Sequence, residues 1–191
     1  EDNRGTYIFN SKDMCMLEYL PELIEAGIAS FKIEGRMKSI FYIAHVLNAY
    51  RKAIDAYYEN PAEYKFNPLW FEEMCKASHR EFTTAFYFNK PTNEDQNYLT
   101  SAYTRDYSFT GLVLDYDPET KIATVEQRNR MFIGDEIEVF GPGTDFFSQK
   151  LEYMTDEEGT PLESAPHPQQ ILKIKMDKPV ERMYRLRKEN R

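Results

Sequence analysis

Three charged side chains in Ser30–Arg36, S-F-K-I-E-G-R, are the first candidates for chemistry in this 191-residue chain. Side chains alternate along a β-strand, so Lys32 and Glu34 are expected on one face, with Arg36 following in the same phase. A carboxylate between two cations stays ionised and is able to orient a substrate or hold an anion. From the residues alone, the commoner outcome is an internal ion pair or a solvated strand face.

Cys15 is the second candidate, because it lies early in an expected helix, where the helix dipole favours a thiolate. A thiolate there is a metal ligand or a nucleophile, but one cysteine makes no site, and a buried structural role is the favoured alternative. Cys75 has no motif around it and is assigned to packing. Two cysteines so far apart indicate a reducing, cytoplasmic setting rather than a disulfide framework.

Basic side chains form a third set of candidates. His79 and Arg80 precede an apolar-aromatic run and are candidates to bind phosphate or substrate, with a capping or surface role favoured. A possible RNA-phosphate patch in the C-terminal half comprises Arg128, Arg130, Lys173 and Lys175, with the basic tail 181–191. A solvated turn is the equal alternative for this set. The sequence has no Gly-rich phosphate loop, HExxH or CxxC, so it offers no self-contained catalytic centre.

The elements that would position these residues differ between the two halves of the chain. The first half predicts strands at 6–9 and 28–33, and helices from Ser11 to Gly27 (divided at Pro21), from Ser39 to Asn60 and over 68–77. This β-α-β-α order indicates parallel strands covered by helices, as in the last quarter of a (β/α) TIM-like barrel. The polar stretch 91–106 predicts a boundary, which gives domains 1–98 and 99–191.

The second half predicts short strands without a helix, at 108–116, 121–127, 136–140, 146–154 and 171–176. This pattern favours a small closed all-β barrel, which leaves no strand edge. The net charge of −8 argues against a generic basic nucleic-acid binder but not against a local basic patch. No apolar run approaches the length of a membrane span. The chain begins with Glu rather than Met, so we expect a piece of a longer protein.

Several motifs together resemble one known family. They are N-S-K-D-M-C at 10–15, S-F-K-I-E-G-R-M-K-S at 30–39, Y-R-K-A-I-D at 50–55, S-H-R-E-F-T-T-A-F at 78–86, V-E-Q-R-N at 125–129, G-D-E-I-E-V-F-G-P-G at 134–143 and A-P-H-P-Q-Q at 165–170. The series resembles the U32 family of collagenase-like peptidases. Within it, the chain is similar to the bacterial branch that hydroxylates tRNA uridine at position 5 using prephenate. A sister branch hydroxylates a ribosomal RNA cytidine.

The resemblance implies a TIM-barrel-like catalytic domain followed by a C-terminal β-barrel. It also implies an iron–sulfur cluster whose ligands lie mostly upstream of residue 1, with Cys15 as the remaining one. Lys32, Glu34 and Arg36 would stand at the catalytic rim of a barrel strand. The expected partners are tRNA or rRNA and the upstream part of the same protein, with no membrane.

Two alternatives to an RNA hydroxylase remain open at this stage. The family name suggests a peptidase, although the chain has no nucleophile, metal or carboxylate pair with supporting spacing. The other alternative is a non-catalytic RNA-binding and docking module. In either enzymatic case, we expect the 191-residue chain to be inactive without the rest of its parent protein.

Overall fold

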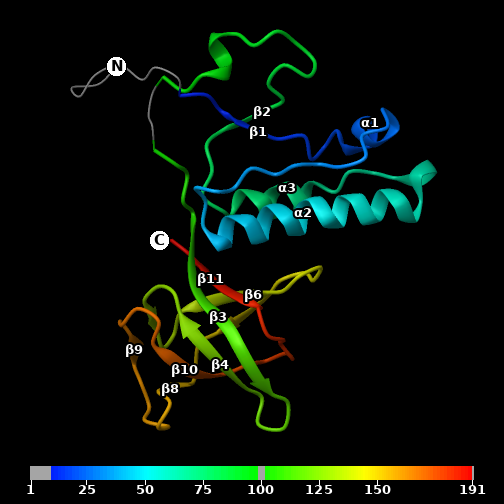
Figure 1. Ribbon diagram of the computed structural model, residues 1–191. Coiled ribbons are helices and arrows are strands. Elements are labelled where there is room, and N and C mark those ends of the chain that lie inside the picture. The colour runs from blue at the N-terminus through cyan, green and yellow to red at the C-terminus, as the bar shows by residue number, and fades with distance from the viewer. Residues whose placement is uncertain (1–9, 99–101, 191) are drawn as a thin grey trace. The chain divides into compact units, whose positions relative to one another are not determined.

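The computed structural model describes residues 10–98 and 102–190 (Figure 1). The chain forms two compact units, Glu1–Arg105 and Asp106–Arg191, each with its own hydrophobic core.

Helix α2 (Ile40–Glu59) is the main element of unit 1 and matches the helix that the sequence predicts. Ser39 has an extended backbone, and its hydroxyl accepts a hydrogen bond from Tyr42 N at 3.2 Å, so it caps the first turn. Asn60 ends the helix before the 3-10 turn Pro61–Glu63. Helix α3 (Pro68–Cys75), also predicted, lies alongside α2 (Figure 1). The core that they share contains Leu17, Leu20, Val46, Ala49, Ala53 and Met74.

The segment before α2 differs from the prediction in where its helix begins. Helix α1 spans only Leu20–Glu25, with Pro21 in its first turn, and Gly27 follows it at φ +81°. The predicted start at Ser11 is wrong, because Ser11 forms an antiparallel bridge with Gln96. Directly after it, β1 (Asp13–Met14) pairs in parallel with β2 (Phe82–Thr83), so this stretch is extended rather than helical.

The predicted strand at 28–33 is not formed. Among the described residues, β1 and β2 pair with each other, and no strand offers residues 28–33 a ladder of hydrogen bonds. The side-chain alternation is nevertheless present, since Phe31 and Ile33 pack against the core of unit 1. The predicted strand at 6–9 lies outside the described residues, and the (β/α) barrel is not seen in this part of the chain.

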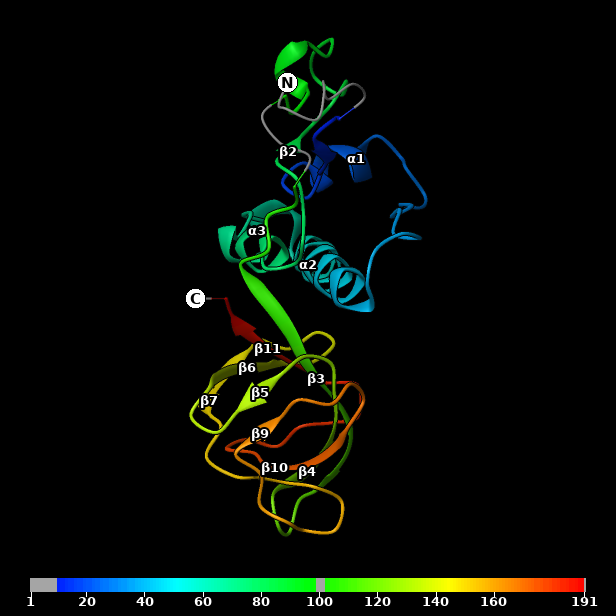
Figure 2. The same ribbon diagram turned by 90° about the vertical axis from the view of Figure 1, so that its left-hand side faces the viewer.

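Unit 2 is built on a seven-stranded antiparallel sheet that curls strongly (Figure 2). Its strands, in spatial order, are β7 (Phe147–Lys150), β6 (Glu136–Phe140), β11 (Arg185–Glu189), β3 (Tyr107–Asp117), β4 (Ile122–Gln127), β10 (Ile171–Lys175) and β8 (Met154–Thr155). A separate pair joins β5 (Met131–Phe132) to β9 (Ser164–Ala165). Register shifts between Val113 and Asp115 and between Leu186 and Arg187 increase the local twist of the central strands.

The expectation of a closed barrel is corrected by this topology, because β7 and β8 stand at the two ends of the sheet order. A side chain spans part of the opening instead. Gln149 on β7 donates from Nε2 to Lys175 O at 2.9 Å and accepts from Asp177 N at 3.1 Å. The curled sheet encloses a core that includes Val113, Val125, Ile137, Leu172 and Leu186, all fully buried.

Strand β11 is an element that the sequence does not reveal, since its residues were predicted to form a basic tail. It lies between β6 and β3, and its Arg187 is fully buried. The guanidinium donates from Nε and Nη2 to Glu138 Oε2, both at 2.6 Å. The rings of Tyr107, Phe140 and Phe146 surround it, with centroids 4.8–5.3 Å from Cζ. A charge this deep is tolerated because its hydrogen bonds and aromatic contacts replace water.

We expect Arg187→Ala to lower the free energy of unfolding of unit 2 by about 3 kcal/mol, because it leaves a partly buried Glu138 without its partner. Urea unfolding followed by circular dichroism measures the change. Arg182→Ala is the matched control, because Arg182 is exposed and its loss should cost little. Equal midpoints for the two variants would contradict this role for Arg187.

Candidate functional site

Cys15 in unit 1 is held by contacts from two other elements. Its backbone N–H donates to Thr83 O at 2.9 Å, which extends the β1–β2 pairing by one residue. Its sulfur lies 3.8 Å from the hydroxyl of Tyr50 on α2. The same hydroxyl accepts from Met16 N at 3.0 Å, so its proton is available to the sulfur. Tyr50 therefore fixes the thiol against α2.

Burial raises the pKa of the half-buried Cys15 thiol above its ordinary value, and the hydrogen bond from Tyr50 opposes this shift only in part. Burial is also the main cause of the raised pKa of the Tyr50 hydroxyl. Both groups are therefore protonated at neutral pH in the chain as it stands. A thiol in this state is not a poised nucleophile, because nucleophilic cysteines need a lowered pKa.

Cys15 opens onto a pocket of about 380 Å³. The lining of the pocket includes four aromatic rings and two carboxylates: it consists of Cys15, Glu18, Tyr19, Phe66, Pro68, Phe71, Glu72, Phe82, Thr83 and Thr84. A thiol in an apolar wall suits a soft metal or an iron–sulfur cluster. Within 10–98 and 102–190, no group of three or more His, Cys, Asp or Glu is placed to hold a metal ion. Among the described residues, this pocket thus provides one thiol ligand, that of Cys15, for an iron–sulfur cluster. Further ligands would have to come from outside the described residues.

The structure does not bring Lys32, Glu34 and Arg36 together with Cys15 in its pocket. All three side chains are exposed, as expected for one face of an alternating segment. Glu34 Oε1 accepts a hydrogen bond from Arg36 N at 2.9 Å, which closes a local turn. In the described part of the chain, no ion pair links any of them to another side chain, so of the two outcomes that residue chemistry alone favoured, the solvated face is seen and the internal ion pair is not.

Sequence reasoning missed a residue just beyond this segment, Lys38. Its ammonium lies 3.7 Å from Asp13 Oδ2 and over the rings of Tyr42 and Tyr103, at 4.8 and 4.2 Å from their centroids. Lys38 thereby joins the start of α2 to β1. The signal available was the motif itself, since Lys38 follows directly in R-M-K-S and Asp13 lies in N-S-K-D.

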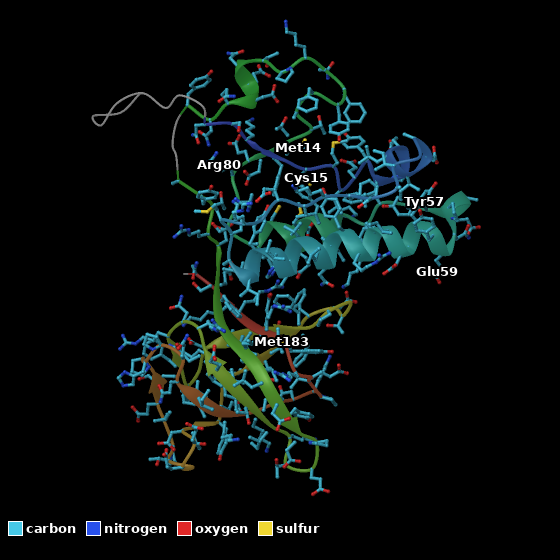
Figure 3. The ribbon with its side chains drawn as sticks, in the orientation of Figure 1. Met14, Cys15, Tyr57, Glu59, Arg80 and Met183 are labelled. Carbon is cyan, nitrogen blue, oxygen red and sulfur yellow. The ribbon has the colours of Figure 1, made fainter. Side chains whose placement is uncertain are left out.

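His79 and Arg80 also make contacts around β1 and β2, where Lys38 lies close to Asp13. Arg80 donates from its backbone N to Asp13 Oδ2 and from Nη1 to Ser11 O, both at 3.1 Å. His79 stacks on Phe82 with the ring centroids 4.8 Å apart, and its Nδ1 lies 2.8 Å from Ala77 O. Figure 3 labels Arg80, Met14 and Cys15 along these neighbouring segments. The contacts favour a positioning role for both residues over direct work on a substrate.

In unit 2, the structure brings the predicted basic residues together only in part. Arg128 and Arg130 are exposed neighbours after β4, and Arg128 forms an ion pair with Glu126 at 2.6 Å. Lys173 donates to Thr124 Oγ1 at 2.7 Å. Lys175 is opposite Ile122, at the far end of the β4–β10 ladder from Arg128. Arg128 lies six positions after Ile122, so at the rise of a strand Lys175 and Arg128 are about 20 Å apart.

The comparisons with known proteins agree with the two-unit organisation. Residues 1–97 match the family described as Peptidase family U32, and residues 105–187 match the Peptidase family U32 C-terminal domain. The chain therefore belongs to peptidase family U32, which confirms the family predicted from the motifs. The (β/α) barrel of the first half stays a prediction. Among the described residues, no helix is long and apolar enough to cross a membrane.

Individual relatives carry two kinds of name. The tRNA hydroxylation protein P1 of Bacillus subtilis (strain 168) is 44% identical over 91% of this chain and 41% of its own length. The tRNA hydroxylation protein P of Escherichia coli (strain K12) is 34% identical over 87% of this chain and 36% of its own length. A collagenase of Porphyromonas gingivalis is 29% identical over 98% of this chain and 52% of its own. The chain thus spans less than half the length of the first two.

A solved structure of related sequence covers unit 2. It is the C-terminal domain of a Geobacillus thermoleovorans putative U32 peptidase, 52% identical over 43% of this chain and 92% of that one, with a TM-score of 0.42.

The environment of Cys15 predicts its reactivity in the metal-free chain. In a Cys75→Ala background, alkylation of Cys15 should titrate at a higher pH than alkylation of an unstructured peptide with the same local sequence, because burial disfavours the thiolate. Tyr50→Phe should move the titration to still higher pH, since it removes the hydrogen bond that stabilises the thiolate. Mass spectrometry of iodoacetamide labelling measures both. A titration at or below that of the peptide would contradict the described burial.

Proposed function

We propose that this chain is part of an enzyme that hydroxylates a tRNA uridine at position 5, with prephenate as co-substrate. The observation that carries the proposal is the 44% identity, over 91% of the chain, to a protein named for tRNA hydroxylation. The identity extends across both units, so it concerns the site around Cys15 as well as unit 2. Because the chain spans 41% of that relative, the complete activity is attributed to the parent protein and not to these residues alone.

Cys15 is proposed as one ligand of an iron–sulfur cluster, with the other ligands upstream of residue 1. Its support is the soft thiol at the wall of a pocket of about 380 Å³ and the backbone hydrogen bond that holds it there. Such a cluster supplies electron-transfer chemistry. The residues of this chain position the ligand: Thr83 fixes its backbone, and Tyr50 orients its sulfur. Binding to the cluster would release the thiol proton, because the thiolate is the ligand.

Lys32, Glu34 and Arg36 are proposed as residues of the catalytic rim. They are exposed, and no ion pair with a described residue neutralises Lys32 or Arg36. Two such cations suit a dicarboxylate such as prephenate, and Glu34 stiffens the turn by accepting from Arg36 N. In unit 2, Arg128 and Arg130, with Lys173 and Lys175 along the adjoining ladder, are proposed to contact RNA phosphates.

Neither Cys15 nor Cys75 forms a disulfide, which is consistent with the reducing, cytoplasmic setting that forms part of this proposal. A ribosomal RNA substrate is the alternative within the same chemistry.

A peptidase remains the second candidate, because a relative covering 98% of the chain is named a collagenase. The geometry at Cys15 favours it less, since the thiol faces a tyrosine hydroxyl and its pKa is raised. The purified full-length protein would then cleave a collagen-like peptide without RNA or prephenate. If neither cleavage nor hydroxylation occurred but RNA were bound, the third candidate, a docking module, would stand.

Deleting the parent gene should remove a hydroxylated uridine from tRNA, which nucleoside mass spectrometry detects. Complementation with Cys15→Ala should fail to restore the nucleoside and should abolish the visible absorbance of the cluster in the purified protein. Complementation with Cys75→Ala is the matched control and should restore it. An unchanged tRNA nucleoside profile in the deletion strain would overturn the proposed function, and full restoration by Cys15→Ala would remove Cys15 from the ligands.

Reversing two charges tests the RNA contact. Arg128→Glu with Arg130→Glu should weaken tRNA binding by the chain and reduce the slope of log K against log salt, since two phosphate contacts are lost. Lys121→Glu with Lys178→Glu is the control, because it makes the same change in net charge at exposed positions on other loops of unit 2. Equal weakening by the two double variants would place the RNA contact elsewhere.

A further inference from the structure

Phe132 is an exposed aromatic side chain on the surface of unit 2 with two cations close to its ring. It is 43% exposed although it lies in strand β5. The Arg130 guanidinium carbon lies 5.5 Å from the centroid of its ring, and the Lys188 ammonium lies 5.4 Å from it. The two cations come from different places in the sequence, the loop after β4 and strand β11, so the fold itself assembles this group.

The ring is held in place by a tight turn. Asp135 Oδ2 accepts from Phe132 N at 2.9 Å, and Asp135 N donates back to Phe132 O at 3.1 Å. Gly134 takes the positive φ of +94° that this turn needs. The same Asp135 oxygen accepts from Lys188 Nζ at 2.7 Å, which ties the turn to β11. An exposed ring on a backbone fixed in this way loses little freedom when it binds a partner.

The charges around Phe132 differ in how far they are neutralised. Lys188 is paired with Asp135, and Arg128 nearby in the sequence is paired with Glu126. No ion pair to a described residue engages Arg130, which is exposed. Arg130 is therefore the cation of this group best placed to meet a phosphate.

A hollow of about 380 Å³ adjoins Lys188, lined by Gly134, Asp135, Glu136, Lys188, Glu189 and Asn190. Its carboxylates repel phosphate but accept hydrogen bonds from the N–H groups of a base. The surface thus offers a ring for stacking, a cation for phosphate and carboxylate acceptors for a base edge. This combination is the one used for single-stranded nucleic acid.

We propose that Phe132, with Arg130 and Lys188, forms a stacking platform for one unpaired nucleotide of the RNA substrate. This proposal rests on the proposed function, which supplies RNA as the class of substrate. It adds that unit 2 contacts an unpaired nucleotide of that RNA. A base within a duplex has both faces covered by its neighbours, so the platform takes a nucleotide from a loop or a single-stranded end. A protein partner would use the same ring but would not distinguish unpaired from paired RNA.

The test measures binding of the 191-residue chain to two fluorescein-labelled RNAs, a hairpin with an unpaired uridine-rich loop and a duplex of equal length without a loop. The expected result is tighter binding of the hairpin, and a loss of about tenfold in hairpin affinity for Phe132→Ala with an unchanged salt slope. Phe132→Tyr should restore the affinity, because it keeps the ring. Arg130→Ala should lower the salt slope by about one unit.

Tyr153→Ala is the matched control, since Tyr153 is 45% exposed in the same unit and lies outside the group described here. Circular dichroism of each variant shows that it folds. Equal affinity of Phe132→Ala and the unchanged chain for the hairpin, or equal binding of hairpin and duplex, overturns the platform. The proposed function is tested separately by the deletion strain. If that strain lacks the hydroxylated uridine, the proposed function holds even when the platform is overturned. An unchanged nucleoside profile in that strain overturns the proposed function whatever the binding test shows.

Discussion

A β-strand exists only where a neighbour accepts and donates its backbone hydrogen bonds, and this constraint decides the form of both units. In unit 1, β1 and β2 satisfy each other over two residues each, and the extended segment 28–33 finds no third strand in the described part of the chain. In unit 2, β11 finds two neighbours and becomes a central strand despite its charged sequence. The availability of a pairing partner thus decides strand formation in both cases: a strand-like segment without a partner forms no strand, and a charged segment with two partners does.

The local signals in the sequence were reliable wherever one segment determines its own structure. The α2 helix from Ser39 to Asn60 follows from short-range spacing, and so do the strands β3, β4 and β10. The start of α1 did not follow, because Ser11 is drawn into an antiparallel bridge with Gln96, far away in the sequence. Non-local pairing of this kind leaves no trace in a periodicity.

Strand β11 illustrates the same limit in energetic terms. R-L-R-K-E has the composition of a solvated tail, and the position of Glu138 on the next strand, together with the surrounding aromatic rings, makes a buried Arg187 tolerable. Glu138 in turn has an outward-facing pattern in its own segment, with Ile137 and Val139 turned to the core. Each residue alone indicates solvent exposure, and their pairing across two strands is part of what explains the burial of Arg187. A sequence without an alignment cannot supply that pairing.

The candidate site likewise combines residues that the sequence identifies with long-range contacts that it does not. The residue types at Cys15 and in the Lys32–Arg36 segment were identifiable from their motifs, and the alternating exposure of that segment follows from the strand-like spacing. The contacts of Cys15 with Tyr50 and of Lys38 with Asp13 were not identifiable, because each joins the region of β1 to the region of α2 across more than twenty positions. Both contacts act on the same junction. Tyr50 of α2 contacts Cys15 and Met16 just after β1, and Lys38, two residues before α2, contacts the first residue of β1, so these two side chains hold the short strand from both ends. A two-residue strand has too few ladder hydrogen bonds to fix a thiol by itself. The orientation of Cys15 toward its pocket therefore depends on side chains of α2 at least as much as on the sheet.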